Sequence, residues 1–335
     1  MTGRYRFLWQ KTKEGNAKLL RAYGETPEVV LPEQIAGCPL TDIGAYCFSE
    51  AEHLPRENVL ETEVFLDEEG KFSDRDAGRN PLAVLAGDYP ECILLPDSIK
   101  KVGNLSFYNC RKLKSLKIGK ELVEIGSDAF MNCRNLRELF VSCDVRDRTG
   151  LKQILAQISW GITVVFQKRD TVFAKVFYPE YQEVYDEIAP AHIFGRNIEG
   201  EGFRARQSFK EGAIDLAQYD LIFPRACVEE NEDTLLALAV ARLSYPVDLK
   251  SEPRQLYETY MKEHSGHLAK KEIREKNLSS LCFLCENRYL TGAALDETVT
   301  LAAEAGWVEG AASLLKWKKE YDTKEKKDRY AFDDF

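Results

Sequence analysis

Residues 103–139, GNLSFYNCRKLKSLKIGKELVEIGSDAFMNCRNLREL, contain one pattern of residues twice. The positions that define the pattern recur with a constant period of 23: Gly103 and Gly126, Phe107 and Phe130, Cys110 and Cys133, Leu113 and Leu136, and Leu116 and Leu139. The same register continues outward through Ile99, Leu122 and Val145. A constant period predicts a solenoid, because a coil that cannot bury its own apolar side must stack on its neighbours.

The apolar residues of each period predict where the strands lie. LKSLKI (113–118) and LRELFV (136–141) have the L-x-x-L-x-L spacing of leucine-rich repeats, whose period is about 20–29 residues. We expect Leu and Ile to fill the strand side of the core, and Phe107 and Phe130 to fill the opposite wall. One glycine per coil marks a corner where we expect a positive φ or a close backbone approach: Gly44, Gly103 and Gly126.

A cysteine column follows the same register. A looser copy of the pattern, IGAYCFSEAEHL (43–54), matches the later coil at a shift of 59. It places Ala51 where the later coils have Cys110 and Cys133. A column that accepts Ala as well as Cys indicates a small buried side chain rather than a nucleophile or a metal ligand.

These repeats resemble a known family. LPDSIKKVGNLSFYNC (95–110) and KIGKELVEIGSDAFMNC (117–133) resemble the BspA-type leucine-rich repeat, and VVLPEQIAGCPLTDIGAYCF (29–48) resembles that family's longer first repeat. The resemblance covers about residues 17–145, with an interruption at 55–91. It implies a right-handed solenoid used for binding. Members of this family are bacterial and protist proteins, many of them displayed on cell surfaces.

The predicted fold class is α+β, with an N-terminal leucine-rich-repeat β-solenoid followed by a C-terminal α-helical repeat domain. We assign residues 1–167 to the repeat domain. Its predicted caps are a hairpin of YRFLWQ and AKLLRAY before the repeats, and a helix, LKQILAQIS, with a strand, ITVVFQ, after them.

The rest of the chain divides into two predicted parts. Residues 168–230 form a mixed connecting segment, in which we expect a helix at 179–188 and a loop at 194–209. Residues 231–335 show helical periodicity, and 297–315 resemble an ankyrin-type helix pair with Gly306 at its bend. Spacings of i, i+3, i+4 and i+7 predict one apolar helix face there, made by Val308, Ala311, Ala312 and Leu315.

Charge and composition exclude several classes of protein. Acidic residues outnumber basic ones 55 to 46, and the formal charge of −9 disfavours a broad nucleic-acid or anionic-lipid surface. No apolar run approaches the roughly 18 residues of a membrane span, so we expect no membrane insertion. The charged start lacks the apolar core of a signal peptide, and nine scattered cysteines suit a reducing compartment. We therefore expect a cytoplasmic protein, or a surface or secreted one only if a signal peptide was removed.

Two groups of residues have spacings that bear on chemistry. Cys282-x-x-Cys285, with His264-x-x-His267 upstream, has spacing like that of a zinc site, but its cysteines lie in an apolar helical run, which favours buried thiols. Three arginines lie close together within residues 194–209 and could cradle a phosphate: Arg196, Arg204 and Arg206. The glycines of this stretch fit neither a Walker loop nor a dinucleotide fingerprint, which favours ordinary loop and salt-bridge roles for these arginines. We therefore predict no catalytic residue, no cofactor and no metal.

Three hypotheses of function follow. The leading one is a non-catalytic scaffold that binds an unidentified protein partner through its leucine-rich and helical repeats. The second is a secreted or cell-surface, adhesin-like protein. The third is an enzyme with a site between the solenoid and the helical domain.

Strand alternation predicts the binding face, because successive side chains point to opposite sides of a strand. Two rows point outward, one of Cys92, Ser115 and Glu138 and the other of Leu94, Lys117 and Phe140. Leu94 and Phe140 are apolar on a face that has no structural need for them. We predict that Phe140, with Lys117 and Arg137 beside it, anchors a partner. The alternative is that a cap or the helical domain covers these side chains.

Overall fold

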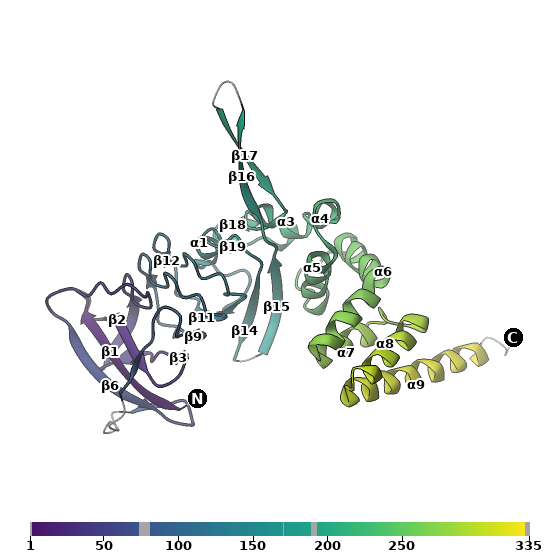
Figure 1. Ribbon diagram of the computed structural model, residues 1–335, viewed down its shortest axis with the longest axis horizontal. Helices are drawn as coiled ribbons and strands as arrows, with labels where there is room; N and C mark the ends of the chain where they lie inside the picture. The colour runs from purple at the N-terminus through teal and green to yellow at the C-terminus, as the bar shows by residue number, and fades with distance from the viewer. Residues whose placement is uncertain (1, 74–80, 170, 189–192, 332–335) are drawn as a thin grey trace. The chain divides into compact units, whose positions relative to one another are not determined.

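The computed structural model describes residues 2–73, 81–169, 171–188 and 193–331. The chain forms two compact units, Met1–Ile222 and Phe223–Phe335 (Figure 1). The first unit is a β-solenoid with its caps, and the second consists of α-helices. The boundary between the units lies inside the segment 168–230 that the sequence marks as a connection.

The coils of the solenoid alternate between two sheets. A six-stranded sheet has the order β15-β14-β13-β11-β9-β3, in which the five strands from β14 to β3 pair in parallel. Its strands are β3 (Glu28–Val30), β9 (Cys92–Leu94), β11 (Ser115–Gly119), β13 (Glu138–Ser142), β14 (Ile162–Lys168) and β15 (Thr171–Tyr178). The coils then cross to a second sheet, where β5 (Cys38–Ile43), β10 (Lys101–Val102) and β12 (Glu124–Ile125) pair in parallel.

The solenoid is continuous in space across the interruption in its sequence. Val29 pairs with Ile93, and Ile43 pairs with Val102 at the predicted shift of 59. Part of the intervening segment forms β6 (Leu60–Leu66), which extends the second sheet by pairing with β1. The coil before the interruption therefore stacks directly on the coil after it.

Strands and a short helix cover the two ends of the solenoid. β1 (Gly3–Lys11) and β2 (Ala17–Gly24) form the N-terminal antiparallel hairpin, and β2 continues the second sheet by pairing with β5. At the other end, α1 (Leu151–Leu155) and β14 follow the last repeat. The antiparallel strand β15, which begins the segment assigned to a connection, extends the six-stranded sheet beyond β14.

The repeated residues form the core. Phe48, Phe107 and Phe130 are fully buried and stack ring on ring, and Leu116 and Leu139 are fully buried on the strand side. The cysteine column is structural, since the Cys133 thiol donates a hydrogen bond to the carbonyl of Phe107 at 2.9 Å. Interaction with the Cys133 thiol, together with burial, raises the pKa of Cys110.

The glycine column serves one of the two predicted purposes. Gly44, Gly103 and Gly126 do not have a positive φ. Instead, a Cβ on Gly126 would lie 2.4 Å from the backbone nitrogen of Asn104, and one on Gly103 would lie 2.6 Å from that of Ala45. The close approach of successive coils therefore requires glycine here. The left-handed turn positions are occupied by other residues: Leu105, Asn109, Asp128 and Asn132.

Two predictions for residues 179–209 are wrong. The expected helix is a strand, β16 (Gln182–Ile188), and the expected loop contains β17 (Ile193–Glu199) and α2 (Gly202–Ala205). β16 and β17 pair antiparallel and extend away from the two large sheets (Figure 1). Val184 and Tyr185 have high strand propensity, and the pairing satisfies the backbone groups that a helix would otherwise pair internally. Two short strands and a helix complete the unit: β18 (Phe209–Lys210), β19 (Ala213–Ile214) and α3 (Leu216–Asp220).

The second unit is helical from its first residues. Its helices are α4 (Phe223–Glu229), α5 (Glu232–Ser244), α6 (Ser251–Glu275), α7 (Leu278–Glu286), α8 (Gly292–Glu304) and α9 (Val308–Ala331). Asn231 and Asn277 cap α5 and α7 by accepting hydrogen bonds from backbone N–H groups of the first turn. Within the described residues, no helix combines the length and the apolar character that crossing a membrane requires.

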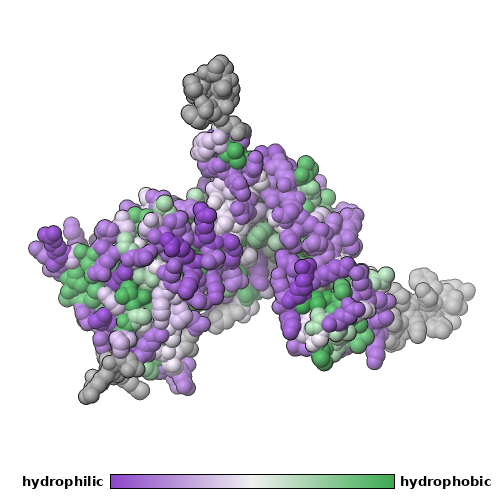
Figure 2. Space-filling model, viewed as in Figure 1, coloured by the Kyte–Doolittle hydropathy of each residue, from purple (hydrophilic) through white to green (hydrophobic). Residues whose placement is uncertain are grey.

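The predicted apolar face of α9 is not the buried one. Val308 is 79% exposed and Leu315 is 47% exposed, whereas Trp307 and Leu314 are buried. The buried stripe lies one residue earlier because Trp307 packs over Gly310, where a Cβ would lie 2.4 Å from the indole ring. Gly306 has a φ of +65° at the bend between α8 and α9, as its position in the helix pair predicts. In Figure 2 a hydrophobic patch is visible over α7 and α8, within a largely hydrophilic surface.

Candidate binding face

The six-stranded sheet aligns the predicted outward residues in the expected register. Ser115 pairs with Cys92 on one side and with Glu138 on the other. Lys117 likewise pairs with Leu94 and with Phe140. The strands pair in parallel and in register, so equivalent positions of successive repeats lie side by side in one row.

The row through Phe140 is longer than the sequence predicts. Val30 on β3 pairs with Leu94, and Val165 on β14 pairs with Phe140. We call the following five residues the central row: Val30, Leu94, Lys117, Phe140 and Val165. Four of its five members are apolar, and it crosses five adjacent parallel strands. At about 4.8 Å between strands, it spans roughly 19 Å.

The central row is neither fully buried nor fully exposed. Val30, Leu94, Lys117 and Phe140 are half-buried, while Val165 is only 2% exposed. The neighbouring row is more polar, with Ser115 half-buried and Glu138 exposed. The accessible part of the row is thus an apolar strip of Val30, Leu94 and Phe140 that contains one cation, Lys117.

The two cations predicted beside Phe140 have different positions. Lys117 lies next to Phe140 in the register. Arg137 precedes β13, and its Nη1 donates a hydrogen bond of 3.4 Å to the carbonyl oxygen of Gly161. Its guanidinium is therefore held at the start of the β14 region, and Lys117 is the cation placed in the row with Phe140.

A pocket of about 660 Å³ lies where the parallel strands of this sheet end. It is lined by Asp97, Lys117, Lys120, Ser142, Cys143, Asp144, Asp147, Lys168, Arg169 and Phe173. Lys117 belongs both to the central row and to this pocket, so the two features are continuous. Burial, with the charges of Asp147 and Asp144, raises the pKa of Cys143 to about 12, which keeps this thiol protonated at neutral pH.

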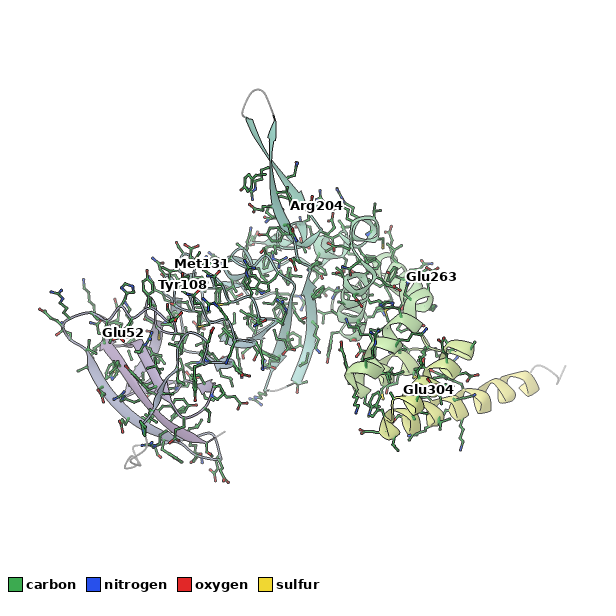
Figure 3. All side chains as sticks on the ribbon, in the orientation of Figure 1. Glu52, Tyr108, Met131, Arg204, Glu263 and Glu304 are labelled. Atoms are coloured by element: carbon green, nitrogen blue, oxygen red, sulfur yellow. The ribbon has the colours of Figure 1, made fainter. Side chains whose placement is uncertain are left out.

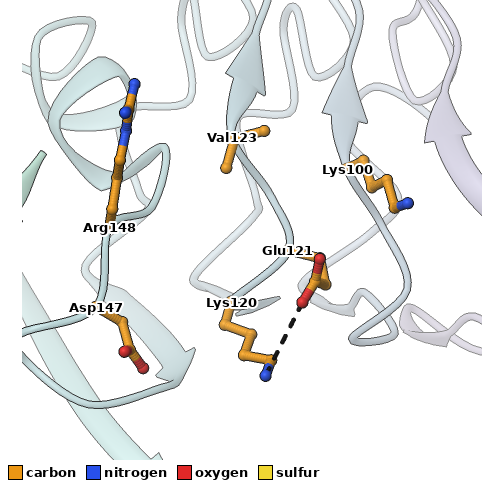
Figure 4. A pocket seen from close by; sticks show the side chains of 6 residues that line it. All are labelled: Lys100, Lys120, Glu121, Val123, Asp147 and Arg148. Atoms are coloured by element: carbon orange, nitrogen blue, oxygen red, sulfur yellow. Dashed lines mark ion pairs between the residues drawn. The ribbon is translucent and has the colours of Figure 1, made fainter.

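A second, smaller hollow of about 360 Å³ lies beside the first and shares Lys120 and Asp147 with it. Figure 4 shows Lys100, Lys120 and Arg148 on different sides of this hollow, with their charged ends well separated. Lys120 forms a loose ion pair of 3.9 Å with Glu121. The charged groups do not converge, so the hollow has no centre at which a ligand would be held.

The arginines of residues 194–209 form no phosphate cradle. Arg206 is buried and donates hydrogen bonds to the carbonyl oxygens of Ile158, Trp160, Pro179 and Gly202 at 2.6–2.8 Å. Burial lowers its pKa to about 10. Arg196 pairs with Glu183, and Arg204 pairs with Glu201 near the foot of the β16–β17 hairpin (Figure 3). Each arginine has a structural partner, in keeping with the salt-bridge and loop roles favoured by the sequence.

The cysteine and histidine pairs have separate environments. His264 and His267 on α6 contact Glu232 at the start of α5, with N–O distances of 2.6 and 3.1 Å. Cys285 on α7 is buried, and burial raises its pKa to about 12. In the part of the chain that the structure describes, no three His, Cys, Asp or Glu side chains are grouped as metal ligands would be.

The comparisons with known proteins find one match, and it lies in the solenoid. The family model for the BspA type leucine-rich repeat region (6 copies) matches residues 90–149. This stretch is therefore similar to BspA-type repeats in its repeat pattern. No curated protein and no solved structure matches the chain. The BspA-type match lies within the solenoid that carries β9, β11 and β13, and the helical unit lies outside it.

Sequence reasoning missed both ends of the central row. Val30 is farther from Leu94 in sequence than one period of the repeat, and Val165 is likewise farther from Phe140. The repeat pattern therefore does not predict the position of either valine. A signal was present, since VV at 29–30 and VV at 164–165 each place one valine on the core side of a strand and the next on the opposite side. Those pairs are the counterparts of Ile93–Leu94 in the repeats.

Proposed function

We propose that this chain is a non-catalytic scaffold that binds a protein partner on the outward face of its six-stranded sheet. The observation that carries the proposal is the central row, in which four apolar residues align across five parallel strands. Phe140 and Leu94 are only half-buried there, although strands facing water ordinarily alternate apolar and polar residues. Repeat proteins present extended surfaces of this kind to their partners.

The row has the composition of an interface centre. Binding energy concentrates in a few large side chains, and aromatic residues are enriched among them. Phe140 provides such a side chain, and Lys117, next to it in the row, also lines the adjoining pocket. The exposed Glu138 and Arg137 lie at the margin, where polar groups surround an interface core.

The environment of the thiols supports a non-catalytic role. Burial raises the pKa of Cys92, of Cys143 and of Cys285, so these thiols are poor nucleophiles at neutral pH. Cytoplasmic location is part of the proposal and rests on the nine free cysteines. A further part is that α8 and α9 form an ankyrin-like repeat with a binding role of its own, for which the exposed Val308 and Leu315 provide apolar surface.

The test compares partner capture by three forms of the full chain. Wild type, Phe140→Ala and Met131→Ala are used as baits in lysate of the native cells, and captured proteins are quantified. Met131 is 48% exposed and lies one period after Tyr108, on the coil turns away from the six-stranded sheet (Figure 3). We expect Phe140→Ala to lose partners that Met131→Ala retains. Equal retention by both variants, with their folds intact, would contradict the proposed face.

A further inference from the structure

The pocket at the strand ends gathers four cations from different parts of the chain. Lys117 lies on β11, Lys120 follows that strand, Lys168 ends β14, and Arg169 follows it. Among the described residues, Lys117, Lys168 and Arg169 take part in no ion pair, and Lys120 has only its loose contact with Glu121. The chain as a whole carries a formal charge of −9, so this local excess of unpaired cations runs against the overall charge.

Two of the acidic residues in the pocket are engaged within their own loop. Asp147 accepts a hydrogen bond from the backbone N–H of Asp144 at 2.9 Å. Asp144 accepts one from the backbone N–H of Arg146 at 3.0 Å and pairs with the Arg146 guanidinium at 3.7 Å. Their carboxylates are therefore bound by local donors rather than by the four cations of the pocket.

The third acidic residue, Asp97, faces the lysines without forming a contact ion pair. Burial and the nearby charge of Glu33 raise its pKa, while Lys117 and Lys120 act in the opposite direction. Asp97 therefore retains its proton to a higher pH than an ordinary aspartate.

The size and lining of the pocket fit a small group with both charged and apolar parts. Its volume of about 660 Å³ lies within the usual range of ligand pockets, roughly 300–1,000 Å³. The Phe173 ring supplies an apolar wall, and the hydroxyl of Ser142 supplies a neutral donor. The planar guanidinium of Arg169 suits two oxygens of one anion, and lysines bind phosphate as point charges.

We propose that this pocket binds a phosphate ester whose organic part is aromatic or apolar. The phosphate lies among Lys117, Lys168 and Arg169, and the organic part lies against Phe173. The ester belongs either to a small molecule or to a phosphorylated side chain of a peptide. The pocket adjoins the central row at Lys117, but its phosphate contacts do not involve Phe140, so either proposal stands if the other fails.

The experiment measures binding of phenyl phosphate to the full chain by isothermal titration calorimetry in buffer of low ionic strength. Inorganic phosphate, benzoate and phenol serve as comparison ligands. We expect phenyl phosphate to bind more tightly than all three, because only it provides both a dianion and a ring. No measurable binding of phenyl phosphate, or equal binding of benzoate, would overturn the proposal.

Variants identify the pocket. Lys168→Ala/Arg169→Ala should weaken phenyl phosphate binding at least about tenfold, because two charge-assisted contacts are lost. Lys112→Ala/Arg134→Ala removes the same charge from exposed positions on the coil turns and should leave affinity unchanged within about twofold. Equal weakening by both double variants would show only a general effect of net charge and would overturn the pocket assignment.

A third comparison distinguishes the two sources of the ester. A phosphotyrosine hexapeptide with apolar flanking residues is titrated against wild type and Phe140→Ala. A peptide that binds more tightly than phenyl phosphate, and loses that gain in Phe140→Ala, assigns the site to a phosphorylated side chain that reaches the central row. Equal affinities for peptide and phenyl phosphate assign it to a small phosphate ester.

Discussion

The ring of Phe107 lies parallel to the ring of Phe130, with centroids 5.1 Å apart and an angle of 9° between their planes. Phe48 stacks on the other face of Phe107 at 5.2 Å and 2°. One aromatic column therefore joins a coil before the interruption in the repeat to the two coils after it. Because all three rings are fully buried, the column links the stability of coils that are distant in sequence.

Replacing Phe130 with Ala should destabilise the first unit by about 3–5 kcal/mol, the usual effect of removing a buried aromatic ring. Chemical denaturation followed by near-ultraviolet circular dichroism measures this change. Met131→Ala is the matched control, because the neighbouring side chain is 48% exposed. If Phe130→Ala lowers the free energy of unfolding by less than about 1 kcal/mol, the column does not carry the stability assigned to it.

Gly126→Ala should destabilise the same unit by roughly 1–3 kcal/mol, since the new methyl group would force two coils apart. The added Cβ would lie 2.4 Å from the backbone nitrogen of Asn104. Gly3→Ala provides the comparison, because its Cβ would make only an ordinary contact of 3.7 Å with Glu25. Thermal unfolding of the two variants should differ clearly, and equal midpoints would show that the coils accept a side chain at this corner.

Arg206→Lys should destabilise the end of the solenoid by roughly 3 kcal/mol, although the charge is kept. A lysine has one ammonium group and does not reach the four carbonyl oxygens that the guanidinium binds. Arg196→Lys, at a side chain that is 50% exposed, should have little effect. Hydrogen exchange across residues 158–206 would detect the loosening, and unchanged protection there would refute this role for Arg206.

How far the sequence predicts the structure depends on periodicity. Phe107, Leu116 and Cys110 recur at a constant interval, and each has the predicted buried position, because stacked coils place equivalent side chains in equivalent surroundings. The rows of the binding face follow from the same interval. The periodicity did not predict that Val30 and Val165 belong to the central row, because they lie on coils whose lengths differ from the period of the repeat.

Where no repeat exists, local patterns were ambiguous. Residues 179–188 contain both helix-forming glutamates and strand-forming Val184 and Tyr185, and the pairing of β16 with β17 decided between them. In α9 the predicted stripe of Val308 and Leu315 has helical spacing, yet the neighbouring Trp307 buries more apolar surface. Spacing alone therefore identified the helix but not the side that faces its neighbours.

The contact between α5 and α6 should depend on pH through Asp233. Burial acts to raise the pKa of Asp233, but the hydrogen bond with His267 and the charge of Lys271 outweigh it and hold the pKa below its ordinary value of 3.8. A lowered folded-state pKa adds stability above the unfolded value, and this stability is lost as pH falls through the folded pKa. Glu232 and His264 border the same cluster.

Asp233→Asn should therefore unfold at a lower temperature than wild type at pH 7, with a smaller difference at pH 3. Glu263→Gln, at an exposed position on α6, is the control and should show no such change with pH (Figure 3). Thermal unfolding at both pH values, followed by far-ultraviolet circular dichroism, makes the comparison. A difference that stays constant or grows at pH 3 would show that Asp233 does not stabilise this contact as a carboxylate.

Site-specific photo-crosslinking tests the central claim, that the outward face of the six-stranded sheet binds a protein partner, most directly. Benzoylphenylalanine replaces Leu94 in the central row in one form of the full chain and the exposed Met131 in another, and both are irradiated in native cells. We predict discrete covalent adducts with a protein partner from position 94 and none of the same mass from position 131. Adducts from position 131 alone, or from neither position, would contradict this binding face.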